Sequence, residues 1–196
     1  MAEPATPIFH SLDDFLAWEE RQEERYEFLP GGVITMMAGG TSDHAQITTN
    51  LAVALQPRVR DRACFVFTSG AKVVSREQNT AVYPDVIVRC GAIGGKTTSV
   101  DDPIVVFEVL SESTMKHDFT RKRQVYMAMP SVQVLVYVSQ DEYRMDVFRR
   151  AAAGVFAVEV LEGREAVLTL PEIGAELSLA EIYLATSLST APGDTA

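Results

Sequence analysis

One segment that is apolar on both faces except for a single carboxylate constrains the fold most strongly. Residues 103–110 read Pro-Ile-Val-Val-Phe-Glu-Val-Leu. Alternate side chains of a β-strand point to opposite faces, so both faces of this strand are apolar except at Glu108. Such a strand must be covered on both sides, and a lone buried charge costs several kcal/mol unless it is paired or binds a metal. The segment therefore predicts a sheet between helices and a specific use for Glu108.

A second carboxylate, Asp85, stands at the start of another apolar strand, Tyr-Pro-Asp-Val-Ile-Val. If the two strands are neighbours joined by the loop at 91–102, the carboxylates of Asp85 and Glu108 converge. Two acidic oxygens aimed at one point suit a hard divalent cation. The alternative is that each carboxylate accepts backbone hydrogen bonds or pairs with an arginine, as structural ion pairs do.

Lys122 lies on the apolar face of the helix expected over 113–129, which Pro130 ends. It is three residues after Phe119 and four before Tyr126, where the pattern calls for a hydrophobic residue. A lysine so placed suits a phosphate or an attacking water. Two simpler explanations remain open, a stem that snorkels to solvent and an ion pair with Asp118.

The rest of the pattern predicts a single α/β domain over residues 9–185, with a mixed sheet between helices and a disordered tail at 186–196. Capping residues and apolar spacing indicate where the helices begin, and β-branched runs between turn residues indicate the strands. A short helix is expected to begin at Ser11, and three further helices are expected over 41–60, 113–129 and 178–183. A hairpin is expected to pair 26–29 with 33–37. Further strands are expected over 64–68, 71–74, 83–89, 103–110, 132–138, 143–149, 155–161 and 166–170.

Composition narrows the function. The chain has 196 residues and a net charge of −10, whereas a general nucleic-acid binder is usually basic. It can therefore reach phosphate only through a local basic patch, such as the one that includes Lys116, Arg121 and Arg123, or through a bridging metal. We see no signal peptide and no apolar run of membrane-spanning length, and we expect Cys64 and Cys90 to be reduced core thiols in a cytoplasmic protein.

The combined motif resembles a bacterial family described as "putative restriction endonucleases", which belongs to the PD-(D/E)xK nuclease superfamily. The residues that carry the resemblance are spread over positions 9–185: Tyr83-Pro84-Asp85-Val86, the run 107–114, Asp118 with Lys122 and Tyr126, and upstream 26–32, Met36-Met37-Ala38 and His44. The resemblance implies a restriction-endonuclease-like core, a mixed β-sheet flanked by helices, acting on DNA with a divalent metal and often as a homodimer.

It also implies roles for individual residues. Asp85 and Glu108 would hold Mg²⁺ or Mn²⁺ with the carbonyl of Val109, and Glu27 matches an upstream acid that could hold a water of the metal. A surface position for Glu27 is an equal alternative. The superfamily pattern places a lysine two residues after the second acid, where this chain has Leu110. Lys122 therefore takes the lysine role.

The next candidate for the lysine is Lys72, which alternates with hydrophobic residues beside the same sheet. His44, Lys116, Arg121 and Arg123 are candidates for phosphate or DNA contact, although His44 at a helix start could equally bond to backbone.

Two functions from different classes follow. The first is a metal-dependent DNA endonuclease that hydrolyses phosphodiester bonds, favoured by the acid pair and the inward lysine. The second is a catalytically inactive module with a nuclease fold that binds nucleic acid or another protein. The net charge of −10 and the presence of Leu110 at the usual lysine position favour it. A hydrolase of small phosphorylated substrates is a more distant third.

Overall fold

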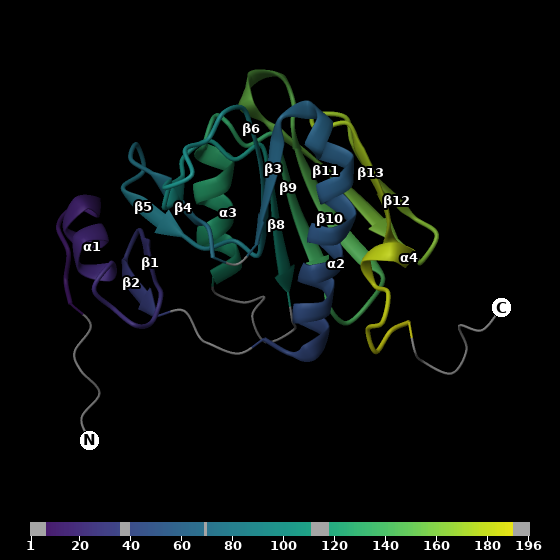
Figure 1. Cartoon of the computed structure of the whole chain (residues 1–196), viewed down its shortest axis with the longest axis horizontal. Helices are drawn as coiled ribbons and strands as arrows, with labels where there is room; N and C mark the ends of the chain where they lie inside the picture. Colours follow the sequence, from purple (N-terminus) through teal and green to yellow (C-terminus); the bar gives the residue numbers. More distant parts are fainter. Residues whose placement is uncertain (1–6, 36–39, 69, 111–117, 190–196) are drawn as a thin grey trace.

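The computed structural model describes residues 7–35, 40–68, 70–110 and 118–189. It confirms the expected α/β fold with mixed sheets flanked by helices, and Figure 1 shows the elements. The helices are α1 (Leu12–Glu19), α2 (Ser42–Val59), α3 (Asp118–Ala128) and α4 (Leu179–Ile182), with short 3-10 turns at Arg60–Arg62 and Ala152–Gly154. The strands are β1 (Tyr26–Leu29), β2 (Gly32–Thr35), β3 (Cys64–Thr68), β4 (Lys72–Ser75), β5 (Thr80–Val82), β6 (Val86–Cys90), β7 (Ser99–Val100), β8 (Val105–Leu110), β9 (Val134–Ser139), β10 (Arg144–Arg150), β11 (Phe156–Glu162), β12 (Val167–Leu170) and β13 (Ala175–Ser178).

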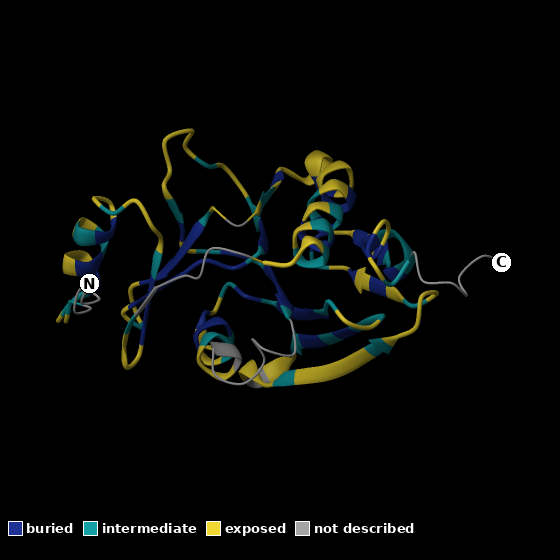
Figure 2. Ribbon diagram, turned by 90° about the horizontal axis from the view of Figure 1, so that it is seen from below, coloured by how far each residue is buried: buried dark blue, intermediate teal, exposed yellow. Residues whose placement is uncertain are grey.

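The larger sheet has the strand order β11-β10-β9-β8-β6-β3 and is covered on both faces. Its alternating side chains divide between two cores, since Val105 and Phe107 pack with α2, α4 and the β12–β13 hairpin, while Val106 packs with α3. Figure 2 shows the buried strands between the helices of the two faces. By this alternation Glu108 faces α3.

Strand register explains how the two acidic positions meet. β6 pairs antiparallel with β8, with Val86 opposite Phe107. Continuing that register one step past the end of β6 sets Asp85 opposite Glu108. β8 pairs in parallel with β9, and a parallel pair needs a crossover connection, which here contains α3. The crossover returns α3 over the face on which Glu108 lies.

The smaller sheet has the order β2-β1-β5-β4-β7 and is packed against α1. Along β1, Phe28 belongs to the aromatic cluster under α1, while Leu29 belongs to the core that also contains α3 residues. Glu27 alternates with Phe28 and so points away from α1. The smaller sheet therefore delivers Glu27 to the same region as Glu108.

Several boundaries differ from the sequence prediction. β5, β7 and β13 were not predicted, because strands of two to four residues carry almost no periodic signal. β7 lies within the loop at 91–102 and pairs in parallel with β4. The expected tail begins later than residue 186, since Thr186 is buried and Ser187 hydrogen-bonds to Asp43; residues 190–196 lie outside the described part.

The expectation of two reduced cysteines is wrong. Cys64 and Cys90 oppose each other directly in the β3–β6 register, and their sulfur atoms are bonded. Sequence spacing of 26 residues does not reveal which residues face each other across a pair of strands. Among the described helices, none combines the length and the apolar character needed to cross a membrane.

Candidate active site

Lys122 lies between two carboxylates that come from different sheets. Its Nζ is 2.7 Å from Glu108 Oε1 and 3.2 Å from Glu27 Oε1, and it donates to the backbone carbonyl of Tyr83 at 3.4 Å. All three charged side chains are nearly inaccessible, with exposed fractions of 12% for Lys122, 9% for Glu108 and 5% for Glu27. The lysine therefore does not snorkel to solvent, and Glu27 is not a surface residue.

Tyr126 is a partner of this cluster that sequence reasoning missed. Its hydroxyl donates to Glu108 Oε1 at 2.6 Å, and its ring is fully buried. It was interpreted only as an apolar residue of the helix. The available signal was its position four residues after Lys122, because residues four apart share a helix face and so reach the same carboxylate.

Asp85 approaches from the turn before β6. Its Oδ2 accepts a hydrogen bond from the Val109 backbone N–H at 2.7 Å and lies 3.3 Å from His44 Nε2. His44 stands in the first turn of α2, whose N-cap Thr41 accepts the His44 N–H. The His44 side chain thus contacts a carboxylate of the cluster, and the phosphate contact expected for it stays a prediction.

The cluster holds more acid than base. Burial, together with the nearby carboxylates of Asp85 and Glu27, raises the pKa of Glu108 from 4.5 to about 7, although Lys122 opposes that shift. Burial alone would lower the pKa of Lys122, but Glu108 and Glu27 outweigh it and raise that pKa, so the ammonium stays charged. The hydrogen bond to Asp85 raises the pKa of His44. An excess of buried carboxylate around one lysine favours a further cation.

The chemistry of the donor set fits Mg²⁺ or Mn²⁺. Carboxylate oxygens of Asp85 and Glu108 and the carbonyl of Val109 are hard ligands of the kind these ions prefer. Within the described residues, no three His, Cys, Asp or Glu side chains lie close enough together to hold an ion in the present arrangement. Lys122 is in contact with Glu108, so the lysine and an ion would compete for that carboxylate.

The other predicted residues lie outside this cluster. Lys72 pairs with Glu19 at 2.7 Å, so it does not take the lysine role beside Asp85 and Glu108. Arg121 is exposed, and its guanidinium lies against Gly31 in the β1–β2 turn. Arg123 lies over the ring of Phe148 at 5.7 Å. Lys116 is outside the described residues.

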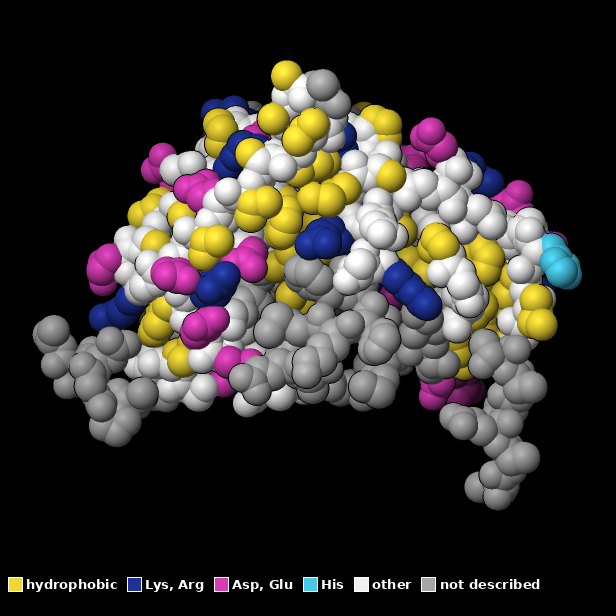
Figure 3. Space-filling view, turned by 180° about the vertical axis from the view of Figure 1, so that it is seen from behind, with side chains coloured by type: hydrophobic (Ala, Val, Ile, Leu, Met, Phe, Trp, Pro, Cys, Tyr) yellow, Lys and Arg dark blue, Asp and Glu magenta, His cyan; other side chains and the backbone are white. Residues whose placement is uncertain are grey.

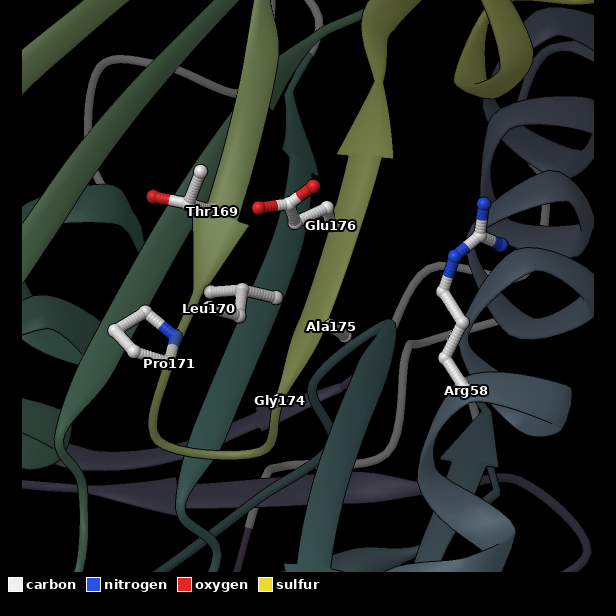
Figure 4. Close-up of a pocket in the computed structure, with 7 residues that line it drawn as sticks. All are labelled: Arg58, Thr169, Leu170, Pro171, Gly174, Ala175 and Glu176. Carbon is white, nitrogen blue, oxygen red and sulfur yellow. The ribbon is translucent and has the colours of Figure 1, made fainter.

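Two further features of the described surface bear on nucleic-acid binding. The face in Figure 3 intersperses acidic and basic side chains around apolar ones, and its described part has no continuous basic patch. A pocket of about 600 Å³ lies between the C-terminal part of α2 and the β12–β13 hairpin (Figure 4). Its one cation, Arg58, is already paired with Glu181 at 2.9 Å. Because Arg58 is paired with Glu181, it gives no ground for assigning a phosphate site to this pocket.

Comparison with known proteins identifies the family. Residues 12–181 match the model of the Uma2 family, whose description is "Putative restriction endonuclease". The chain belongs to the Uma2 family. The resemblance inferred from the Asp85, Glu108 and Lys122 motifs is thereby confirmed at the level of the family.

Relatives of this Uma2 chain agree in length and fold. Two uncharacterized proteins of Synechocystis, slr1290 and sll1609, are each 28% identical, over 88% and 83% of this chain and 90% and 93% of their own. A crystal structure from Anabaena variabilis, described as a "putative nuclease" of DUF820, superposes with a TM-score of 0.71. It covers 90% of this chain and 98% of its own at 20% identity, and so it shows the fold.

Proposed function

We propose that this chain is a metal-dependent endonuclease that hydrolyses phosphodiester bonds in DNA. The observation that carries the proposal is the buried acidic excess, in which Glu27, Asp85 and Glu108 surround a single lysine. A protein that needed only stability would balance or omit such charges, because uncompensated buried carboxylates are destabilising. Membership of a family of putative restriction endonucleases and the fold of a putative nuclease support the same class.

Asp85, Glu108 and the Val109 carbonyl would hold Mg²⁺ or Mn²⁺, which when bound polarises the scissile phosphate and lowers the pKa of its water. Glu108 must be ionised for this role and must give up its contact with Lys122. Tyr126, which donates to Glu108, orients that carboxylate.

Lys122 has a second set of partners that persists when Glu108 turns away. Glu27 and the Tyr83 carbonyl keep its ammonium at the site. From there it can orient the attacking water or stabilise charge that develops on the phosphate. His44 borders the same carboxylate cluster and can donate to a phosphate oxygen, and exposed Arg121 can contact the DNA backbone farther out.

The test is cleavage of supercoiled, linear, single-stranded and branched DNA with Mg²⁺ or Mn²⁺. We expect slow cleavage that requires the ion and is lost in Asp85→Ala together with Mn²⁺ binding. Lys122→Ala should abolish cleavage and retain the ion, because a charged lysine has no lone pair for a metal. Cleavage that survives in Asp85→Ala would contradict the proposal.

A catalytically inactive module is the second candidate, and one observation favours it. Lys122 contacts the Glu108 carboxylate on which a metal would have to bind, and Leu110 replaces the lysine of the general pattern. In an inactive module the ion pair is the permanent state. Titration with Mn²⁺ separates the two candidates, since a protein that neither binds the ion nor cuts any of the DNA forms is the inactive module.

We also propose that the enzyme is a homodimer. Cutting both strands of a duplex requires two active sites, and two-fold dimers are the commonest way to supply them. Light scattering at micromolar concentration tests the dimer, and a monomer there would contradict it.

A further inference from the structure

A second buried lysine–carboxylate pair lies next to the candidate site. Lys72 in β4 contacts Glu19 Oε2 at 2.7 Å, and their side chains are only 9% and 6% exposed. Glu19 is the last residue of α1. Its other oxygen, Oε1, accepts a hydrogen bond of 2.5 Å from the hydroxyl of Tyr83. Both oxygens of this buried carboxylate therefore have partners, which is the condition for burying a charge at tolerable cost.

Tyr83 connects this pair with the candidate site. Its backbone N–H donates to Glu27 Oε1 at 2.8 Å, and its carbonyl accepts from Lys122 Nζ at 3.4 Å. Two residues later in the chain comes Asp85. Tyr83 thus contacts Glu19 through its side chain, and Glu27 and Lys122 through its backbone. It also leads directly to Asp85, which accepts a hydrogen bond from Val109 in β8.

The intervening Pro84 makes this connection stiffer. Proline fixes its own φ angle and restricts the residue before it to extended conformations. Fixing the ring of Tyr83 therefore also limits the directions open to its carbonyl and to the chain that leads to Asp85. The ring is held on its other sides as well, since it is buried and the guanidinium of Arg25 lies 5.4 Å from its centre.

We infer that Tyr83 is a positioning residue for the candidate active site, held through its hydroxyl by Glu19, whose charge Lys72 balances. The backbone of Tyr83 then sets where Glu27 and Lys122 stand. The catalytic consequence rests on the proposed nuclease function, whereas the mechanical link from α1 to Lys122 does not.

A role limited to filling space makes a different prediction. The ring of phenylalanine fills the same volume, and Glu19 would keep Lys72 as its partner in a Tyr83→Phe variant. Losing one hydroxyl donor lowers the stability without removing the carboxylate's ion pair. If Tyr83 merely packs, the ammonium of Lys122 should not sense that change.

The chain is well suited to a direct test, because it has four lysines, Lys72, Lys96, Lys116 and Lys122. The ammonium groups of buried, paired lysines exchange slowly with water and give separate ¹H–¹⁵N NMR signals. Lys72 and Lys122 are assigned from the variants Lys72→Met and Lys122→Met in metal-free protein. In Tyr83→Phe, we expect the Lys122 signal to shift or broaden by exchange while the melting transition stays cooperative.

Two controls isolate the hydroxyl. Tyr183→Phe removes another buried tyrosine hydroxyl, whose partners Ser139 and Arg144 lie outside the network, and it should leave the Lys122 signal in place. The double variant Glu19→Gln, Lys72→Met removes both charges but keeps an amide oxygen that accepts from Tyr83, so it too should leave that signal in place. An unchanged Lys122 signal in Tyr83→Phe, or an equal change in Tyr183→Phe, overturns the inference.

The functional readout is a separate arm. Tyr83→Phe should lower kcat for DNA cleavage about tenfold with little change in KM, because the groups move while the DNA surface does not. The double variant should retain kcat. If wild-type protein neither binds Mn²⁺ nor cuts DNA, the proposed function fails, and the Lys122 signal still decides whether Tyr83 positions that residue. Equal losses of kcat in Tyr183→Phe and Tyr83→Phe overturn the inference while the proposed nuclease function stands.

Discussion

Among the residues that the structure describes, two nearly inaccessible lysines, Lys72 and Lys122, have surroundings that differ in charge balance. Lys72 meets one carboxylate, Glu19, whose remaining oxygen is bound by a neutral hydroxyl. Lys122 meets two carboxylates, Glu27 and Glu108, and a third, Asp85, adds to the negative charge felt by Glu108. Burial is similar at both places. Because of this difference we propose the unbalanced acidic cluster around Lys122, and not the balanced ion pair at Lys72, as the functional site.

The largest expected effects come from removing each lysine in turn. Lys122→Met should lower the cleavage rate at least 100-fold, because it removes the cation beside the reacting phosphate. Lys72→Met should lower the free energy of unfolding by about 3–5 kcal/mol, because it leaves Glu19 buried without its cation. Cleavage assays and urea unfolding measure the two effects.

Mn²⁺ is the control that makes the comparison specific. Added Mn²⁺ should raise the melting temperature of Lys122→Met more than that of wild-type protein, since the ion can replace the missing positive charge. In Lys72→Met it should raise the melting temperature no more than in the wild type. Equal responses in both variants would mean that the two lysines are equivalent, and the distinction drawn between them would fall.

The pH dependence of Glu108→Gln gives the next largest effect. In the folded state the pKa of Glu108 is raised from 4.5 to about 7. The contribution of its bound proton to the free energy of unfolding is therefore fully present below pH 4.5 and is lost as the pH rises through 7. The glutamine variant does not titrate there and can still accept from Tyr126. Its stability relative to wild type should therefore increase between pH 5 and pH 8, by up to about 3 kcal/mol.

Thermal unfolding in metal-free buffers across this range measures the difference. Glu159→Gln, a change of an exposed carboxylate on β11, is the matched control and should show no such increase. If Glu108→Gln instead loses stability progressively as the pH rises, then Lys122 fully compensates Glu108. In that case the cluster around Lys122 would resemble the balanced pair at Lys72.

The smallest expected effect concerns the periphery of the acidic cluster. Arg121 is exposed near the β1–β2 turn, while Arg123 lies over Phe148. Arg121→Ala should weaken DNA binding in the presence of Ca²⁺ a few-fold and reduce the slope of log affinity against log salt by about one. Arg123→Ala should change that slope less. Equal slopes for both variants and wild type would exclude Arg121 from the DNA contact.

The sequence predicted the parts of the site that stand out against a local pattern. Glu108 interrupts an apolar strand, and Lys122 interrupts the apolar face of a helix. The structure places these two side chains in contact. The fold class also followed from local patterns, because the long strands and α2 have clear periodicity.

The remaining features depend on how two sheets pack together. Whether Glu27 is buried depends on which side of β1 faces the larger sheet, and the pairing of Lys72 with Glu19 depends on where α1 packs. The disulfide between Cys64 and Cys90 depends on strand register. Local sequence patterns encode none of these distances, so the acidic excess around Lys122 became evident only from the assembled structure.

The order of the site residues along the chain has a consequence for folding. Glu27 and Tyr83 are 56 positions apart, and the lysine that joins them comes 39 positions after Tyr83. Such contacts form late, because the loops between them must first close. During synthesis the three carboxylates leave the ribosome before Lys122, so an incomplete chain holds these acids without the lysine that pairs with two of them. Docking of α3 brings Lys122 to Glu27 and Glu108 and so supplies the cation of this cluster.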